Sequence, residues 1–162
     1  LNIKNEDNLE VINVTTAKQM FEACKDNLPV DVAVCTAAVS DFKVKNYSEE
    51  KIKKEGLEDF NLELEKNIDI LSFISSQNIN RPRLVVGFAA ETQNIIENAQ
   101  KKLKTKNLDL IVANLIHESM GLQDTKVSII SKNDVIDVPK SNKIVAAKVI
   151  LKEIAHRINS DK

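Results

Sequence analysis

The chain has 162 residues, a length that one domain typically fills. Its net charge of −1 gives no overall attraction for a polyanion, and Trp is absent, which argues against base stacking along a nucleic acid. No apolar run approaches the ~18 residues that a membrane helix needs, and no signal segment opens the chain. The two cysteines are too few for a disulfide framework. We therefore expect a cytoplasmic protein that binds neither nucleic acid nor membrane.

The first part of the chain predicts two strands, a helix and a long loop. Residues 9–14 are typical of a short strand, and Thr15 or Thr16 can cap a helix over residues 17–26. Residues 30–38 are rich in Val and small side chains, which predicts a strand buried on both faces. The polar, lysine-rich residues that follow, 41–60, predict a long loop, and loops of that length are often functional lids.

The middle of the chain alternates between strand and helix patterns. Residues 62–65 alternate like a half-exposed strand, and residues 68–76 predict a short helix. Residues 83–89 predict a second buried strand. We expect Thr92 to cap a helix over residues 93–106.

The last part predicts a strand, a hairpin and a closing helix. Residues 109–113 predict a third buried strand. Residues 127–131 and 135–138 flank a turn and predict a hairpin. Ser141 can cap a helix to residue 158, and the apolar positions of that helix are Ile144, Ala147, Ile150, Leu151 and Ile154. Strands that alternate with helices indicate an α/β fold: a three-layer, Rossmann-like, mostly parallel sheet with helices on both faces and a C-terminal hairpin.

Three predicted core strands end in small or polar residues. The strand over residues 30–38 runs out through Thr36, Ser40 and Asp41, and the strand over residues 109–113 ends at Asn114. Open α/β sheets bind ligands beyond the carboxyl ends of their strands, so this edge of the sheet is a candidate site. Strand ends are commonly polar in any case, and that structural explanation stays open.

Lysines supply two candidate anion sites. Lys51, Lys53 and Lys54 crowd one loop, where they repel one another unless an anion is bound. Lys102 and Lys106 are spaced i,i+4 on one predicted helix, a repulsive arrangement that an anion would relieve. For both groups of lysines the alternative explanation is surface charge that keeps the protein in solution. The phosphate-binding and dinucleotide glycine motifs are both absent, and no Cys/His spacing suits zinc.

Five segments together resemble the bacterial phosphopantothenoylcysteine synthetases. They occur in the order and with the spacing of that family, and the resemblance runs from about Val11 to Arg157. The G-F-A-A-E-T strand is the most specific of the five. The segments are Thr36-Ala37-Ala38-Val39-Ser40-Asp41, Lys51-Ile52-Lys53-Lys54, the stretch Leu64-Glu65-Lys66-Asn67-Ile68-Asp69-Ile70-Leu71, the stretch Arg81-Pro82-Arg83-Leu84-Val85-Val86-Gly87-Phe88-Ala89-Ala90-Glu91-Thr92, and Lys102 with the stretch 106–114.

The resemblance implies a ligase of coenzyme A synthesis. The family activates the carboxylate of 4′-phosphopantothenate with CTP, using a divalent cation that is normally Mg²⁺, and releases pyrophosphate. The amino group of cysteine then attacks the acyl-cytidylate, which gives an amide and CMP. Bacterial members form homodimers, and many are fused to a decarboxylase that binds FMN, a part that this chain does not contain.

The resemblance also implies site residues by position. Lys51 is the family's lysine for forming the acyl-cytidylate, where it would neutralise charge as pyrophosphate leaves. Lys53 and Lys54 would belong to a flap that closes over the intermediate and excludes water. The metal ligands stay unknown. The nucleotide-binding positions are Asp41, Lys51, Ile68, Asp69, Ile70, Leu71, Phe88, Lys102 and Lys106.

Departures from the family pattern qualify these expectations. Ile68 replaces the usual proline, and Leu115 follows Asn114 where aspartate is commoner. The family's N-terminal segment, with its glycine-rich phosphate contacts and an asparagine used in amide formation, has no match before Leu9. We therefore expect residues 1–162 to form a single synthetase domain that is a fragment lacking its first βα units. The alternative function is a non-catalytic nucleotide-binding or assembly module of the same fold.

Overall fold

A computed structural model describes residues 8–48, 50–51, 53, 61–115 and 123–160. The chain divides into two compact units, residues 1–26 with 38–69 and residues 27–37 with 70–162. The proposed flap residue Lys54 lies outside the described residues. No helix within the described part combines the length and the apolar composition that crossing a membrane requires.

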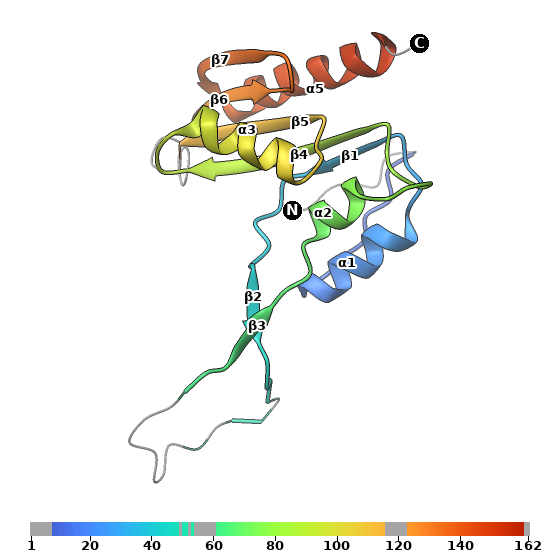
Figure 1. Cartoon of the computed structure of the whole chain (residues 1–162), viewed down its shortest axis with the longest axis vertical. Helices are drawn as coiled ribbons and strands as arrows, with labels where there is room; N and C mark the ends of the chain where they lie inside the picture. Colours follow the sequence, from blue (N-terminus) through green and yellow to red (C-terminus); the bar gives the residue numbers. More distant parts are fainter. Residues whose placement is uncertain (1–7, 49, 52, 54–60, 116–122, 161–162) are drawn as a thin grey trace. The chain divides into compact units, whose positions relative to one another are not determined.

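The second unit is built on a five-stranded sheet in the order β1-β4-β5-β6-β7 (Figure 1). Strands β1 (Val32–Cys35), β4 (Leu84–Glu91) and β5 (Leu110–Leu115) are parallel. The hairpin of β6 (Asp124–Ile130) and β7 (Val135–Asn142) adds two antiparallel strands at one edge. This arrangement confirms the predicted α/β fold, the parallel strands and the terminal hairpin.

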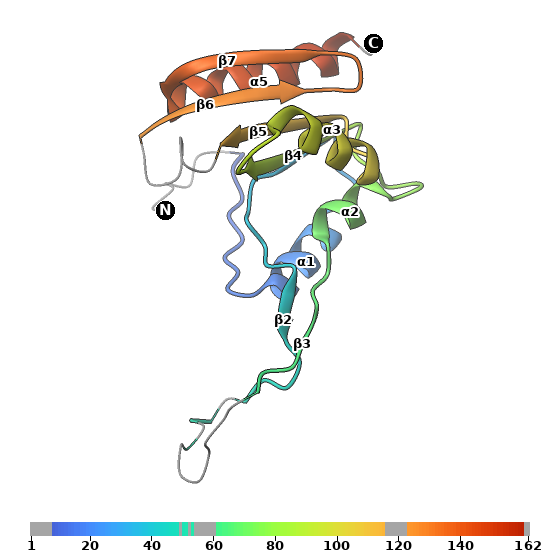
Figure 2. The same cartoon turned by 60° about the vertical axis from the view of Figure 1, so that its left-hand side comes forward.

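Helices cover both faces of this sheet (Figure 2). Helix α5 (Lys143–Ser160) inserts Ile150 and Ile154 among Val86, Val112 and their neighbours on one face. Side chains alternate between the faces of a strand, so Val85 and Ile111 turn to the opposite face. Helices α2 (Ile70–Ser75) and α3 (Ile95–Thr105) pack there, and the three-layer prediction is confirmed.

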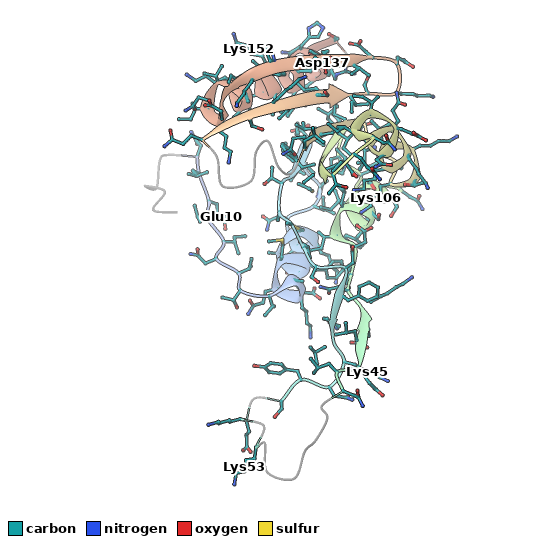
Figure 3. The ribbon with its side chains drawn as sticks, turned by 90° about the vertical axis from the view of Figure 1, so that its left-hand side faces the viewer. Glu10, Lys45, Lys53, Lys106, Asp137 and Lys152 are labelled. Carbon is teal, nitrogen blue, oxygen red and sulfur yellow. The ribbon has the colours of Figure 1, made fainter. Side chains whose placement is uncertain are left out.

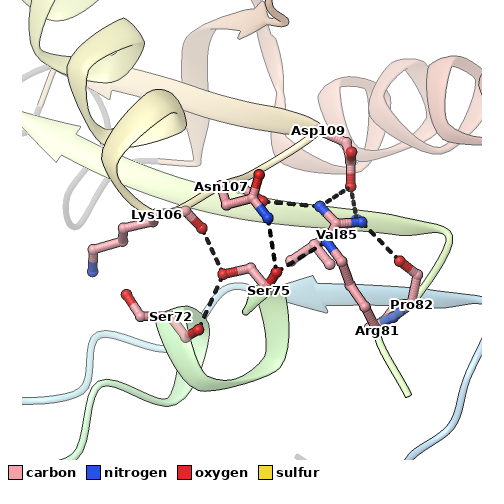
Figure 4. A network of polar contacts seen from close by, with 8 residues as sticks. All are labelled: Ser72, Ser75, Arg81, Pro82, Val85, Lys106, Asn107 and Asp109. Carbon is pink, nitrogen blue, oxygen red and sulfur yellow. Dashed lines mark hydrogen bonds and ion pairs between the residues drawn. The ribbon is translucent and has the colours of Figure 1, made fainter. Parts of the chain in front are cut away.

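A polar clamp ties α2 to the beginnings of β4 and β5 (Figure 4). The Arg81 guanidinium donates hydrogen bonds to the Ser75 carbonyl at 2.9 Å and the Asn107 carbonyl at 2.9 Å, and pairs with Asp109 Oδ2 at 3.0 Å. That same oxygen accepts the Val85 N–H at 2.6 Å. Arg81 thus donates to the backbone carbonyls of Ser75 and Asn107, which lie at turns of the chain outside the strand pairing. This role explains why an arginine belongs to the motif that precedes β4.

The first unit contains helix α1 (Ala17–Asp26) and a two-stranded ribbon. The helix has the predicted bounds, and a capping box begins it: Thr16 Oγ1 accepts the Gln19 N–H at 3.1 Å, while Gln19 Oε1 accepts the Thr16 N–H at 3.2 Å. The ribbon pairs β2 (Phe42–Val44) with β3 (Leu64–Lys66). Part of the predicted loop over residues 41–60 is therefore strand.

Three strand predictions are wrong in part. Residues 9–14 form no strand in the described structure, and Leu9 and Ile12 are 44% and 48% exposed, because no neighbouring strand offers hydrogen-bond partners. Strand β1 is not buried on both faces: it has β4 as its partner on one side only, and Val34 is 42% exposed. Strand β3 begins and ends later than the predicted residues 62–65 and is exposed throughout.

The predicted helix ends also need correction. The cap of α3 is Asn94 in a left-handed conformation, not Thr92, because the extra turn lets the chain reverse direction after β4. Ser141 belongs to β7, and Asn142 Oδ1 accepts the Ile144 N–H at 2.8 Å at the start of α5. Helix α2 begins at Ile70 rather than at residue 68. Ile144 and Leu151 stay 67% and 59% exposed, so the apolar stripe predicted for α5 is only partly buried.

Candidate functional site

The carboxyl ends of the three parallel strands border a groove of about 420 Å³. Its polar lining comes from the strand ends, with Thr36 after β1 and Asn114 near the end of β5. Phe88 and Ala90 of β4 lie between them, and Val112 completes the sheet wall. The predicted cluster of polar and small residues at one edge of the sheet is confirmed, and it borders a cavity large enough for a small molecule.

Helix α5 and the hairpin form the opposite wall of this groove. Strand β7 runs parallel to β5, because each hairpin strand is antiparallel to its neighbour, so β7 ends at the same edge of the sheet. Helix α5 starts directly after β7, and its first residue, Lys143, lines the groove. Thr125, Val127, Ala146, Ala147 and Ile150 complete the lining. None of the described lining residues is acidic.

The predicted nucleotide contacts of the second unit fall on different faces of the sheet. Phe88, 37% exposed, lines the groove beside α5. Glu91, further along β4 and of opposite parity, turns toward α3 and accepts an ion pair from Lys102 at 2.7 Å. Phe88 and Lys102 therefore lie toward different faces of the sheet, and Lys102 does not line the groove beside α5.

Lys102 already has partners in this structure. Its ammonium group binds Glu91 Oε1, and the Asn98 amide donates to Glu91 Oε2 at 3.1 Å. The Glu91 side chain is only 12% exposed, so a buried carboxylate neutralises this lysine. Lys106 lies at the end of α3, where its carbonyl accepts a 2.5 Å hydrogen bond from Ser75 Oγ (Figure 4).

Packing accounts for the side chains at positions 70 and 71. Ile70 is 7% exposed, at the beginning of α2. A Cβ atom at Gly87 would come within 3.0 Å of Leu71 Cδ2, so this leucine packs directly on the β4 backbone. Because packing occupies these two side chains, we expect any contact of Ile70 and Leu71 with a nucleotide to come from their backbone groups.

In the first unit, two predicted site segments meet at the base of the ribbon. The Asn67 N–H donates to the Asp41 carbonyl at 2.8 Å, and the Asn67 side chain donates to the Ser40 carbonyl at 3.1 Å. The Asn67 Oδ1 accepts the N–H of Ile68 at 3.0 Å. This contact holds Asp41 beside the chain that leads to Ile68 and Asp69.

The flap residue Lys53 lies beyond the ribbon (Figure 3). Lys51 and Lys53 are exposed. Closer to the base, Lys43 and Lys45 are paired with Glu65 at 3.1 Å and Glu63 at 3.3 Å. Glutamates of the facing strand segment therefore neutralise Lys43 and Lys45.

The described residues contain no cluster of three His, Cys, Asp or Glu side chains that could hold a metal ion. The Cys24 thiol is also a poor candidate for a nucleophile. Burial raises the pKa of the Cys24 thiol on α1, which favours the protonated, less nucleophilic form at neutral pH.

A family model places this chain among known proteins. The model described as the C-terminal domain of the DNA/pantothenate metabolism flavoproteins matches residues 1–158. The chain belongs to this family. The bifunctional coenzyme A biosynthesis protein CoaBC of Borreliella burgdorferi is 37% identical over 153 residues, which cover 93% of this chain and 39% of that protein.

Solved structures of the flavoprotein family agree with the fold. A crystal structure of the C-terminal domain of a CoaBC protein is 33% identical, with a TM-score of 0.71, and the match covers 92% of this chain and 66% of that one. A DNA/pantothenate metabolism flavoprotein from Streptococcus pneumoniae is 20% identical with a TM-score of 0.75, covering 96% and 77% of the two chains. The chain thus spans about two fifths of the length of its bifunctional relative.

Three residues that line the groove were not predicted as site residues, namely Lys143, Thr125 and Ala147. A signal for Lys143 was present. The first turn of a helix favours acidic residues, and the first turn of α5 contains none while it begins with a lysine. Without the topology of the hairpin, however, nothing in the sequence indicates that this turn lies at the carboxyl edge of the parallel strands.

Proposed function

We propose that this chain is the synthetase part of a ligase that joins 4′-phosphopantothenate to cysteine with CTP as the activating nucleotide. The observation that carries the proposal is 37% identity to a coenzyme A biosynthesis protein across 93% of the chain, with the family model covering residues 1–158. The name of that relative calls it bifunctional. A flavin-dependent decarboxylase, fused or associated, is therefore the proposed protein partner.

The proposed reaction has two steps. A carboxylate oxygen of 4′-phosphopantothenate attacks the α-phosphorus of CTP, and pyrophosphate leaves to give the acyl-cytidylate. The cysteine amine then attacks the acyl carbon, CMP leaves, and an amide forms. Lys51 acts in the first step, where its ammonium group neutralises the negative charge that builds on the departing pyrophosphate.

The proposed nucleotide contacts are the positions that the family resemblance implies. Asp41 and the backbone at residues 68–71 contact the nucleotide, together with Phe88, Lys102 and Lys106, and the segment of Lys53 and Lys54 closes over the intermediate. The hydrogen bonds of Asn67 support the first part of this proposal, because they hold Asp41 next to Ile68. Lys102 would have to bind Glu91 and a phosphate at the same time, so its contribution to nucleotide binding is smaller than that of an unpaired lysine.

The magnesium ion of this proposal arrives with the nucleotide. Mg²⁺ in nucleotide enzymes is commonly held by substrate phosphates and one or two carboxylates rather than by a protein cage. No protein ligand of the ion is assigned. When bound, the ion would neutralise phosphate charge.

A homodimer is the proposed assembly. The ribbon carries its ion pairs on one face, and Phe42, Val44 and Leu64 are 53%, 37% and 58% exposed on the other. Lys66, opposite Phe42, shares that face. A two-stranded ribbon is marginal by itself, so the three exposed apolar side chains favour a covering partner. A second copy would also let Phe88 and Lys102, which face different sides of one sheet, contribute to one composite site.

Substitution of Lys51 tests the proposed reaction. We expect Lys51→Gln in the full-length protein to lose CTP-dependent pyrophosphate release by about 100-fold or more, the size of effect seen when one electrostatic stabiliser is removed. The matched control is Lys45→Gln, which removes a lysine that Glu63 already neutralises. Wild-type pyrophosphate release by Lys51→Gln would rule out the assigned role. If the wild-type protein binds CTP in calorimetry but forms no cysteine-dependent product, the alternative of a non-catalytic nucleotide-binding module holds.

A further inference from the structure

Of the proposed nucleotide contacts only Phe88 lines the groove beside α5, and Phe88 accounts neither for the aliphatic wall of the groove nor for its cation. Most of its lining is aliphatic, from Val112, Val127, Ala146, Ala147 and Ile150. A single cation, Lys143, stands at one end, and no ion pair among the described residues involves this lysine. A site of this kind fits an elongated molecule with an aliphatic body and an anionic end.

Two features make the Lys143 end of the groove favourable for an anion. The lysine occupies the first turn of an 18-residue helix, where the helix dipole already adds positive potential and makes a cation locally unfavourable. No described lining residue carries a negative charge that would compensate it. An anion bound here would satisfy both the ammonium group and the helix terminus.

A buried polar atom beside the groove gives an independent indication. Ser141 lies opposite Thr125 in the pairing of β6 with β7, and directly opposed residues of two antiparallel strands share a face of the sheet. Thr125 is 7% exposed and lines the groove. The Ser141 Oγ is buried and has no hydrogen-bond partner in the described structure, and buried polar atoms normally have one.

We propose that this groove binds the acyl substrate and that Lys143 holds its phosphate group. The proposal rests on the proposed function, since 4′-phosphopantothenate combines an aliphatic, gem-dimethyl arm with an anionic group at either end. The arm lies along the aliphatic wall, and the phosphate lies at Lys143 and the start of α5. The carboxylate of 4′-phosphopantothenate is less suitable as the partner of Lys143. An ion pair with the ammonium group would make this carboxylate a weaker nucleophile toward CTP.

Direct binding measurements on the full-length protein test this assignment. We expect Lys143→Met to raise the Kd for 4′-phosphopantothenate about 10-fold, the usual size for one lost charge-assisted contact. The Kd for CTP stays unchanged, and pantothenate, which lacks the phosphate, binds both forms equally weakly. Lys143→Arg keeps the charge and restores most of the affinity. The matched control is Lys152→Met, which removes a lysine of α5 that does not line the groove (Figure 3).

A second variant tests the groove without changing its charge. Ala147 is exposed on α5 and lines the groove, so Ala147→Phe fills the space while the helix remains solvated. We expect this variant also to weaken the binding of 4′-phosphopantothenate more than the binding of CTP. Its circular dichroism melting curve should stay close to that of the wild type.

Three outcomes separate the possibilities. Unchanged affinity of both groove variants for 4′-phosphopantothenate, in a protein that still forms product, overturns the assignment of the groove but leaves the proposed function intact. A loss confined to CTP makes Lys143 a nucleotide contact and equally overturns the assignment. If the wild-type protein binds neither CTP nor 4′-phosphopantothenate, the proposed function itself fails.

Discussion

Gly87 shows at the scale of one residue why a motif position demands its amino acid. A Cβ atom here would approach Leu108 Cδ1 to 2.8 Å and Leu71 Cδ2 to 3.0 Å. Leu108 is only 6% exposed, so it has little room to move aside. The glycine lets the beginning of α2 and the turn before β5 press against the β4 backbone. Its role is close packing, and no ligand is needed to account for it.

We expect Gly87→Ala to lower the free energy of unfolding by about 1 kcal/mol, at the lower end of overpacking effects, because both crowded atoms are the ends of leucine side chains. Urea titration followed by circular dichroism measures this change as a lower midpoint at an unchanged slope. Leu108→Val removes one crowded methyl group, so the double variant should lose less than the sum of the single variants. Strict additivity would contradict the packing explanation.

The electrostatic surroundings of Lys102 are a second example at the scale of one residue. Lys102 resembles a family nucleotide contact, and its spacing from Lys106 suggested two repelling cations. The structure pairs Lys102 with the nearly buried Glu91, an interaction across α3 and β4 that sequence spacing cannot indicate. A single residue's chemistry was thus predictable, while its electrostatic partner was not.

At the scale of elements, the clamp around Arg81 sets how α2, β4 and β5 begin and end. Asp109 Oδ2 serves two donors at once, the Val85 N–H and the Arg81 guanidinium. Asn107, with a positive φ of 50°, makes the reversal between α3 and β5, and its side chain returns to the Ser75 carbonyl at 3.1 Å. These contacts give a structural role to the family-like stretches over residues 81–92 and 106–114.

We expect Asp109→Ala to lower the free energy of unfolding by about 1–2 kcal/mol, because it leaves the Val85 N–H and one arginine donor without an acceptor. This expected loss of stability already includes a reduction for solvent screening, since the Arg81 and Asp109 side chains are 23% and 33% exposed. Asp109→Asn keeps an oxygen acceptor and should lose less. The control is Glu22→Gln, which removes half of an exposed 3.7 Å ion pair on α1 and should change little. Equal effects of Asp109→Ala and the control, in thermal melts, would argue against the clamp.

Most elements of the fold were predictable from local pattern. The capping residues and apolar spacing of α1 determine its bounds, and the runs of Val and Ile identify β4 and β5. The errors fall where a partner decides the structure. Residues 9–14 have strand-like composition but no neighbour in the described structure to pair with, and β2 has few strand signals yet pairs with β3.

At the scale of the whole molecule, the proposed homodimer predicts a composite site. If Phe88 and Lys102 of different copies serve one nucleotide, a protein with Phe88→Ala and a protein with Lys102→Met should each be weakly active. Mixing the two after co-unfolding and refolding should restore about a quarter of the wild-type activity, because half of the dimers are mixed and each of those has one intact site. Activity that stays at the level of the separate variants would show that both residues act within one copy. Refolded wild-type protein is the control for recovery.

The sequence by itself determined the α/β fold, the order of most strands and helices, and the family, because these depend on side-chain periodicity and on motifs along one stretch of chain. Only the tertiary structure decided that Phe88 and Lys102 face opposite sides of the sheet, that Glu91 neutralises Lys102, and that Lys143 stands at the carboxyl edge of the parallel strands. The physical reason is that these relations arise when strand pairing and helix packing bring together residues far apart in the chain. The direction of β7 alone carries Lys143 to the groove, and no local pattern encodes that direction.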